Sequence, residues 1–159
     1  MSNKEVKEYD KNKNLIYSKD INGYEIWQEF DENNNLIHHK YSSTGQEYWQ
    51  EFDKNNNLIY YKRKKEDQWW AKYDENNNQI YTRHSCGEEV WKEYDENNYL
   101  IHMIEYGSLG KQYEKWWEYN KDNNLIYYKS SYGEKRKFKY NKSGKKTFFT
   151  KIKMFLDPV

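Results

Sequence analysis

Two stretches near the start of this chain of 159 residues are almost identical: residues 29–40 are EFDENNNLIHHK and residues 51–62 are EFDKNNNLIYYK. A marker residue, Asp or Asn directly after Tyr or Phe, identifies further copies at intervals of 21, 22, 21, 21, 25 and 21 residues. The markers are Asp10, Asp31, Asp53, Asp74, Asp95, Asn120 and Asn141. A repeat of this period predicts one small structural unit stacked on its neighbours.

Each copy is predicted to form an antiparallel β-hairpin. Asn-rich segments such as DENNN and DKNNN favour turns, because Asn and Asp bond to their own backbone and tolerate left-handed dihedral angles. Their flanks are rich in β-branched and aromatic residues, which favour strands of about six residues. A second turn, such as SSTGQ or SCGEE, leads to the next copy. We therefore expect an all-β fold of tandem hairpin repeats, as a single domain over residues 1–159.

The repeat does not determine the shape of the sheet, since an elongated meander, a spiral and a closed barrel are all compatible with it. The end copies are atypical, since the first has Val6 and the last has Lys137 where the other copies have Trp. We expect a basic C-terminal cap over about residues 129–159, whose apolar end IKMFLDPV can cover the last edge strand.

A trial register pairs each marker with the residue five positions later. It places the aromatic residue before the marker beside Ile37, Ile59, Ile80 or Ile101, and this face, with Phe52 and Ile59, is the expected core. The opposite face then collects a Trp, a Glu, a Tyr or His, and a Lys from each copy. These residues are Trp27, Glu29, His38 and Lys40 in one copy and Trp49, Glu51, Tyr60 and Lys62 in the next.

The composition predicts a thin fold. Hydrophobic residues make up 35% of the chain against 33% charged residues, and aromatic residues alone account for 19%. Disordered chains are poor in aromatic residues, so we expect a folded protein whose contacts are mostly aromatic. Residues 1–128 carry 17 Lys+Arg and 24 Asp+Glu, a net charge of −7, whereas residues 129–159 carry 10 and 2, a net charge of +8. The two parts are therefore electrostatically distinct.

The expected compartment is the cytoplasm of a bacterial host cell. Cys86 is the single cysteine, and the start MSNKEVKEYD has no apolar run typical of a signal peptide. No segment approaches the roughly 18 apolar residues of a membrane span.

Catalytic and metal chemistry are not expected. Asp31, Asn33 and Asn35 resemble the opening of a calcium loop, but the positions for its Gly and Glu hold Leu36 and Ser42. The histidines lack the fixed spacing of metal ligands, and His38 and His102 occupy a position that is Tyr in other copies. The repeated carboxylates Glu29, Glu51, Glu93 and Glu118 suit cross-strand pairing better than catalysis. We therefore expect no enzyme, cofactor or metal.

Segments such as EYDENN and QEFDKNNNLIYY resemble the YD repeats of RHS-type proteins. That resemblance implies a β-hairpin spiral, although Asn mostly replaces the turn glycine and the chain is too short for a toxin-enclosing shell. A weaker similarity is to MORN-like antitoxin repeats, whose glycine-rich pattern is missing. The Asn- and Lys-rich style is similar to that of phage or mobile-element proteins.

Two functions from different classes follow as expectations. The first is a protein-binding inhibitor, anti-CRISPR-like, that docks on and blocks a larger protein or ribonucleoprotein of a bacterial nucleic-acid-targeting defence system. Its expected contact residues are Trp27, Trp49, Tyr60, Trp70, Tyr81, Trp91 and Trp116. The alternative is nucleic-acid binding, chiefly through the basic C-terminal third, where cations alternate with Phe138 and Tyr140. Its expected residues are Lys62, Arg63, Lys64, Lys65, Lys135, Arg136, Lys137 and Lys139.

Overall fold

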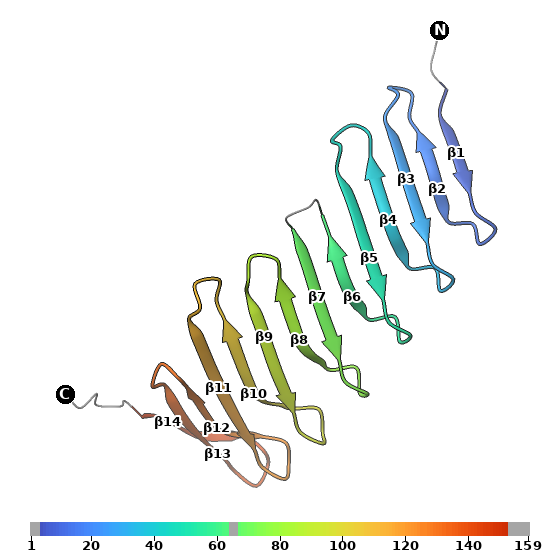
Figure 1. The fold of residues 1–159 in the computed structure, drawn as a ribbon. Coiled ribbons are helices and arrows are strands. Elements are labelled where there is room, and N and C mark those ends of the chain that lie inside the picture. Colours follow the sequence, from blue (N-terminus) through green and yellow to red (C-terminus); the bar gives the residue numbers. More distant parts are fainter. Residues whose placement is uncertain (1–3, 64–66, 153–159) are drawn as a thin grey trace. The chain divides into compact units, whose positions relative to one another are not determined.

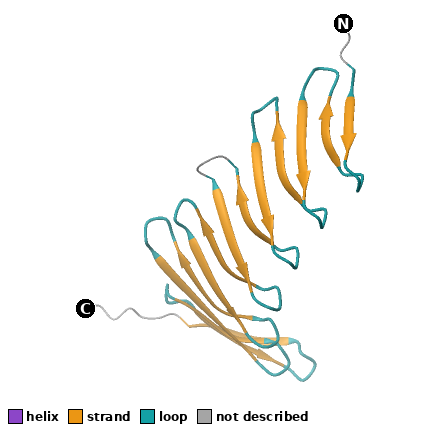
Figure 2. Ribbon diagram, turned by 45° about the vertical axis from the view of Figure 1, so that its right-hand side comes forward, coloured by secondary structure: helices purple, strands orange, loops and turns teal. Residues whose placement is uncertain are grey.

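The computed structural model describes residues 4–63 and 67–152, and these residues form strands and turns without any helix (Figure 2). Among them there is accordingly no helix long and apolar enough to cross a membrane. The strands are β1 (Val6–Tyr9), β2 (Leu15–Lys19), β3 (Glu25–Phe30), β4 (Leu36–Tyr41), β5 (Glu47–Phe52), β6 (Leu58–Lys62), β7 (Gln68–Tyr73), β8 (Gln79–His84), β9 (Glu89–Tyr94), β10 (Leu100–Tyr106), β11 (Gln112–Tyr119), β12 (Leu125–Ser130), β13 (Lys135–Tyr140) and β14 (Lys146–Ile152).

The strands follow one another in the sheet in the order of the sequence, from β1 to β14 (Figure 1). The outer strands of this order do not pair with each other, so the sheet is open and a closed barrel is excluded. The predicted all-β fold of tandem antiparallel hairpins is confirmed. By internal contacts the chain divides into a first unit, Met1–Tyr73 with Thr82–Cys86, and a second unit, Asp74–Tyr81 with Gly87–Val159. Each unit is described by itself below.

The Asn-rich turns are built around the marker residue. In the second copy, Oδ1 of Asp31 accepts hydrogen bonds from the backbone N–H groups of Asn33 and Asn35, each at 2.9 Å, and Oδ2 accepts one from the Asn35 side chain at 3.0 Å. The Asn35 side-chain bond is the main cause that lowers the pKa of Asp31 below its usual value. Both carboxylate oxygens thus serve the turn, as expected from the turn chemistry of Asp and Asn.

The residue three positions after each marker has a left-handed backbone. Asn34 has a φ of 64°, and the same position holds Lys13, Asn56, Asn77, Asn98, Asn123 and Gly144, all with positive φ. Among residues with a side chain, Asn accepts this conformation most readily, which explains why Asn fills a position where glycine is otherwise usual. Side chains also link successive turns, since Oδ1 of Asn34 accepts from the Asn12 and Asn14 amides at 3.0 and 2.9 Å.

A β-bulge follows each of these turns where the register is resolved, and it corrects one prediction. Phe30 pairs with Leu36 and Glu29 pairs with His38, so Ile37 is an extra residue without a partner in the ladder. The same irregularity makes Ile16, Ile59, Ile101, Ile126 and Thr147 the extra residues in other hairpins. The predicted pairing of the aromatic residue with Ile is therefore wrong next to the turn. Beyond the bulge the trial register is right, since Trp27 pairs with Lys40 and Trp49 with Lys62.

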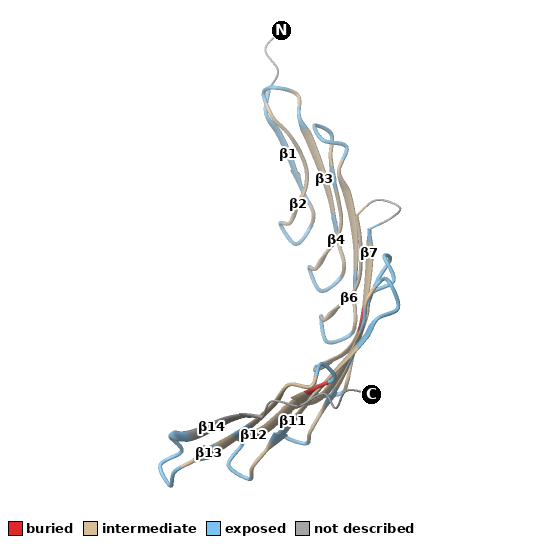
Figure 3. Ribbon diagram, turned by 90° about the vertical axis from the view of Figure 1, so that its left-hand side faces the viewer, coloured by how far each residue is buried: buried red, intermediate tan, exposed pale blue. Residues whose placement is uncertain are grey.

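Burial within each unit is shallow. Among the described residues the buried ones are Ala71, Thr82 and Ser130, and no side chain is completely enclosed. Most strand residues are half-buried, while the turns are exposed (Figure 3). The prediction of a thin fold is confirmed, but the expected core face is wrong: Phe52 pairs with Leu58, Ile59 is the extra residue of the bulge, and no described side chain is fully enclosed.

Serine residues fasten the open ends of three hairpins. The backbone N–H of Glu25 donates to Oγ of Ser42 at 2.7 Å, and the N–H of Ser42 donates to the Glu25 carbonyl at 2.9 Å. Ser85 joins Gln68, and Ser131 joins Glu114, in the same two-way manner. Satisfied backbone groups at these positions extend the hydrogen-bonded ladder beyond the strands.

Candidate functional site

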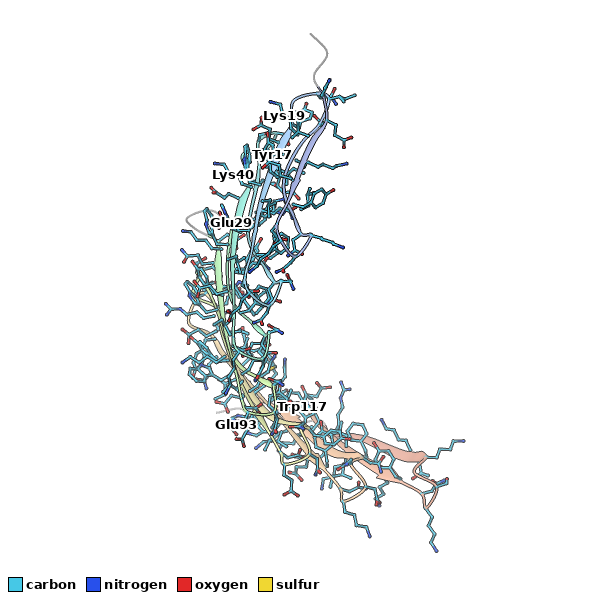
Figure 4. The ribbon with its side chains drawn as sticks, turned by 90° about the vertical axis from the view of Figure 1, so that its right-hand side faces the viewer. Tyr17, Lys19, Glu29, Lys40, Glu93 and Trp117 are labelled. Atoms are coloured by element: carbon cyan, nitrogen blue, oxygen red, sulfur yellow. The ribbon has the colours of Figure 1, made fainter. Side chains whose placement is uncertain are left out.

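The candidate site is one side of the sheet in each unit, which we call the Trp face. It carries the tryptophan found four residues before a marker, together with the Tyr or His paired with it. In the first unit these residues are Tyr17, Trp27, His38, Trp49, Tyr60 and Trp70, and in the second they are Tyr81, Trp91, His102, Trp116 and Tyr127. Figure 4 labels Tyr17, Lys19, Glu29 and Lys40 from this face of the first unit; in the second unit it labels Glu93 from this face and Trp117 from the opposite one.

The Trp face is organised as rows that run across successive strands. His38 stacks on Trp49 with ring centroids 5.3 Å apart, and Nζ of Lys62 lies 4.9 Å from the Trp49 ring on its other side in the sheet. Equivalent rows are Tyr17–Trp27–Lys40, Tyr60–Trp70–Arg83 and His102–Trp116–Lys129. In these four rows a neighbouring ring, stacked for His and tilted for Tyr, and a cation thus contact the tryptophan from two sides.

Carboxylates bracket both histidines of the Trp face. Nδ1 of His38 lies 3.3 Å from Glu29 and Nε2 lies 2.9 Å from Glu47. The corresponding distances at His102 are 3.4 Å to Glu93 and 3.7 Å to Glu114. Tyr and His occupy the same position beside Trp, as the sequence predicts. The His38 and His102 rings stack on it at 17° and 13° between planes, whereas the Tyr17 and Tyr60 rings are tilted by 43° and 40°.

A Lys–Glu pair shows the charge pattern at the end of a row. Nζ of Lys19 lies 2.8 Å from the Glu25 carboxylate, and the hydrogen bond lowers the pKa of Glu25. Both side chains are partly exposed, so this pair contributes little to stability. Its effect is to present opposite charges side by side along the edge of the aromatic rows.

Trp91 is the exposed member of the series. Its side chain stacks near Tyr81, with centroids 4.3 Å apart, but the residue paired with it on β10 is the uncharged Ile104. Trp91 is consequently 45% exposed, whereas the other tryptophans of the face are half-buried. The second unit therefore presents one indole that lacks a cation beside it at the usual position.

The bulged isoleucines also belong to the Trp face. Ile16 lines a hollow together with Tyr17, Trp27 and Glu29, and Ile126 lines another with Tyr127 and Glu118. The bulge therefore brings an aliphatic residue to the side that strand alternation assigns to Trp and Glu. The sequence held a signal for this arrangement, because the consecutive pair Leu-Ile after a turn breaks the alternation of a regular strand.

The seven predicted partner-binding residues all lie on the Trp face of their own unit: Trp27, Trp49, Tyr60 and Trp70 in the first, and Tyr81, Trp91 and Trp116 in the second.

The predicted nucleic-acid-binding residues are divided between the two faces. Lys62 lies over Trp49 on the Trp face, whereas Arg63 lies 5.7 Å from the ring of Tyr48 on the opposite face. Lys135, Lys137 and Lys139 alternate with Arg136 on β13, and Arg136 pairs with Glu134. Lys64 and Lys65 lie outside the described residues.

The repeated carboxylates Glu29, Glu51, Glu93 and Glu118 each pair with the Tyr or His of a row and are spread one per copy. Within residues 4–63 and 67–152, no group of three or more His, Cys, Asp or Glu side chains is placed to hold a metal ion. Cys86 is exposed in the turn before β9. What the face offers chemically is aromatic surface edged by alternating charges.

The fold and this face define a class of protein, a tandem array of antiparallel β-hairpins with an exposed aromatic side. No protein-family model and no curated protein matches the chain. Among solved structures, a crystal structure of TcdB2-TccC3 matches over 83% of this chain and 8% of its own, with a TM-score of 0.61 and 13% identity. A Photorhabdus luminescens Tc holotoxin pore matches over 92% of this chain and 9% of its own, with a TM-score of 0.53 and 14% identity. The likeness shows a shared fold, and this chain spans less than a tenth of those chains.

Proposed function

We propose that this chain is a non-enzymatic protein-binding repeat module, which docks through its Trp face on a larger partner and blocks it. The observation that carries the proposal is the row of half-exposed rings in each unit, over which no other element of the described residues lies. Contiguous exposed aromatic surface on a folded protein typically marks an interaction site.

The arrangement of the rings supports a protein partner. Trp, Tyr and Arg carry most of the binding energy in protein interfaces, and aromatic side chains lose little entropy because they have few rotatable bonds. Here each indole is already contacted by a stacked or tilted ring and, in most rows, by a cation. Preorganised side chains of this kind lower the entropic cost of association.

The partner class rests on the sequence. The proposal takes it to be a bacterial complex that targets nucleic acid for defence, inhibited in the manner of an anti-CRISPR protein. It also takes the repeat to be a divergent YD repeat, supported by the Tyr-Asp marker, the left-handed residue three positions later, and the fold shared with the toxin-complex chains. No encapsulating role is proposed, because the chain spans so small a part of those chains.

Two adjacent tryptophans on β7 provide a matched test. Trp70 lies on the Trp face, paired with Tyr60, and Trp69 lies on the opposite face, paired with Tyr61; both are half-buried. The wild-type chain, Trp70→Ser and Trp69→Ser are each immobilised and exposed to bacterial lysate, and captured proteins are quantified by mass spectrometry. We expect a partner retained by the wild type and by Trp69→Ser to be lost from Trp70→Ser. Retention by Trp70→Ser and loss from Trp69→Ser contradicts the assignment of the face.

A further inference from the structure

One row of the Trp face lacks its tryptophan. In the other rows a Tyr or His stacks near an indole, with centroid separations of 5.9, 5.3, 5.7, 4.3 and 5.2 Å. In the last copy Tyr127 on β12 pairs instead with Lys137 on β13. The position beside the Tyr127 ring that elsewhere holds an indole therefore holds a flexible aliphatic chain with an ammonium group.

An open hollow of about 370 Å³ lies at this position. Glu118, Ile126, Tyr127 and Lys137 line it, and all four belong to the second unit. Its volume falls within the range of about 300–1,000 Å³ typical of small-molecule sites. The Tyr127 ring at its wall is half-buried, so one part of the ring is packed and another is accessible.

The charges around the hollow are inverted relative to most of the other copies. The position six residues before the marker is Glu25, Glu47, Glu89 and Glu114 in four copies, and Lys135 here. The position two before the marker is Glu8, Glu29, Glu51, Glu93 and Glu118 in five copies, and Lys139 here. Besides its Trp, the last copy has therefore exchanged the carboxylates of most copies for ammonium groups at both neighbouring positions of the same face.

The resulting lysines are close to one another on paired strands. Lys129 on β12 is directly opposite Lys135 on β13, and Lys137 and Lys139 are exposed on the same side of β13. Like charges directly opposite each other destabilise a sheet, and a bound anion relieves that repulsion. Nζ of Lys129 also lies 4.1 Å from the centroid of the Trp116 ring. Lys129 therefore lies between the hollow and the row that contains Trp116.

We propose that this hollow binds single-stranded nucleic acid, with one base stacked on Tyr127 where the other rows have an indole. Lys135, Lys137 and Lys139 contact the phosphates that follow the stacked base. Aromatic stacking combined with cations along the backbone is the usual basis of single-strand binding. Glu118, the one carboxylate at the hollow wall, accepts a hydrogen bond from the exocyclic amino group of the base, as carboxylates do with cytosine.

The site differs from the one expected from the sequence. Arg136, Phe138 and Tyr140 alternate with the lysines of β13 and lie on the opposite face, and Arg136 is paired with Glu134 there. Tyr127, which the sequence did not single out for nucleic-acid binding, is the stacking residue. The proposal is also independent of protein docking, since it concerns the row that has no tryptophan.

The decisive variant is Lys137→Trp, which restores in this row the indole found in the others and so places a ring against Tyr127, where the proposal places the base. Lys137→Ala removes the same charge but leaves the hollow open. Binding of a short, fluorescently labelled oligodeoxycytidylate is measured by anisotropy at low and at physiological salt for the intact chain and for both variants. We expect Lys137→Trp to weaken binding by at least about tenfold more than Lys137→Ala, since stacking of one base is worth about 5- to 150-fold in affinity.

Tyr127→Ala and Tyr127→Phe form a second pair. Loss of the ring should weaken oligodeoxycytidylate binding by about 5- to 150-fold, whereas Tyr127→Phe should stay within about threefold of the wild type, because the stacking surface is kept. Inorganic polyphosphate is the control for charge alone, and Tyr127→Ala should leave its binding unchanged. The proposal is overturned if Lys137→Trp and Lys137→Ala bind the oligonucleotide equally, or if folded Tyr127→Ala binds it like the wild type.

Discussion

The imidazole of His38 lies nearly parallel to the indole of Trp49, at 5.3 Å between centroids and 17° between planes, on directly paired residues of β4 and β5. His102 repeats this relationship with Trp116 at 5.2 Å and 13°. Because no described side chain is fully enclosed, such cross-strand stacks take the place of a conventional core in stabilising the strands. The same rings are also half-exposed, which is why one face can serve both stability and binding.

The stacks predict that Trp49 contributes more to stability than Trp91. Trp49→Leu loses a stacked ring and a cation–π contact, which together cost about 1–2.5 kcal/mol. Trp91→Leu loses only the ring contact with Tyr81, about 0.5–1.5 kcal/mol, since Ile104 occupies the cation position. Free energies of unfolding from urea titration should rank the variants accordingly. A larger loss in Trp91→Leu contradicts the assignment of the rows.

Acid should destabilise the turns. Hydrogen bonds, with the Asn35 side chain first, lower the pKa of Asp31, and the pKa values of Asp10, Asp53 and Asp74 are lowered as well. Because the pKa is lower in the folded state than its ordinary value of 3.8, the ionised aspartates stabilise the fold at pH values above 3.8. This stabilisation is lost as the pH falls further and the carboxylates become protonated.

The test is a variant with these four aspartates replaced by Asn, the residue already present at Asn120 and Asn141. It should lose less stability than the wild type between pH 5 and pH 2, because it lacks the four carboxyl groups, which have a pKa of about 4 in the unfolded chain. The measurement is thermal denaturation at each pH. Glu32→Gln, at an exposed neighbour of Asp31, is the control and should follow the wild type. Parallel acid profiles for the wild type and the fourfold variant would refute this role of the markers.

The left-handed turn position predicts a difference between two small substitutions. Asn34→Gly and Asn34→Ala both remove the acceptor used by Asn12 and Asn14. Both residues must adopt a φ near 64°, but only Ala has the Cβ atom that makes this conformation cost about 1–2 kcal/mol. Asn34→Ala should accordingly unfold at lower urea concentration than Asn34→Gly. An Ala variant as stable as the Gly variant would show that this turn does not require the left-handed conformation.

Much of the fold follows from the sequence because the same pattern of turn and strand residues recurs in every copy. The Asn-rich turns and the register of Trp27 with Lys40 are determined by turn chemistry and strand alternation, and both were predictable. The bulge at Ile37 was not predicted, because the trial register assumes that each residue of one strand pairs with one residue of the next, and a bulge adds an unpaired residue. Its trace in the sequence is the consecutive Leu36 and Ile37.

The candidate site was predictable in part for the same reason. Trp49 and Tyr60 share a face because of their spacing, which sequence alone provides. The proposed base position beside Tyr127 depends on which residue on the next strand faces the ring, and it becomes evident only when Lys137 is seen in the place of an indole. A substitution in one copy is thus informative only once the cross-strand neighbours are known.

The central claim, that the Trp face docks on a protein partner, is tested most directly by two adjacent residues of β11. Trp116 lies on the Trp face and stacks on His102, whereas Trp117 lies on the opposite face and contacts Tyr128. Both are half-buried and each has one ring partner, while Trp116 also has Lys129 over its ring, so Trp116→Ser and Trp117→Ser are compared only where both are folded.

The measurement is the dissociation constant of each folded variant for the captured partner, by calorimetry. The account predicts at least about tenfold weaker binding for Trp116→Ser, as expected for an interface anchor worth more than about 1.4 kcal/mol, and less than about twofold change for Trp117→Ser. Equal dissociation constants for the two variants, or a larger effect of Trp117→Ser, would contradict it.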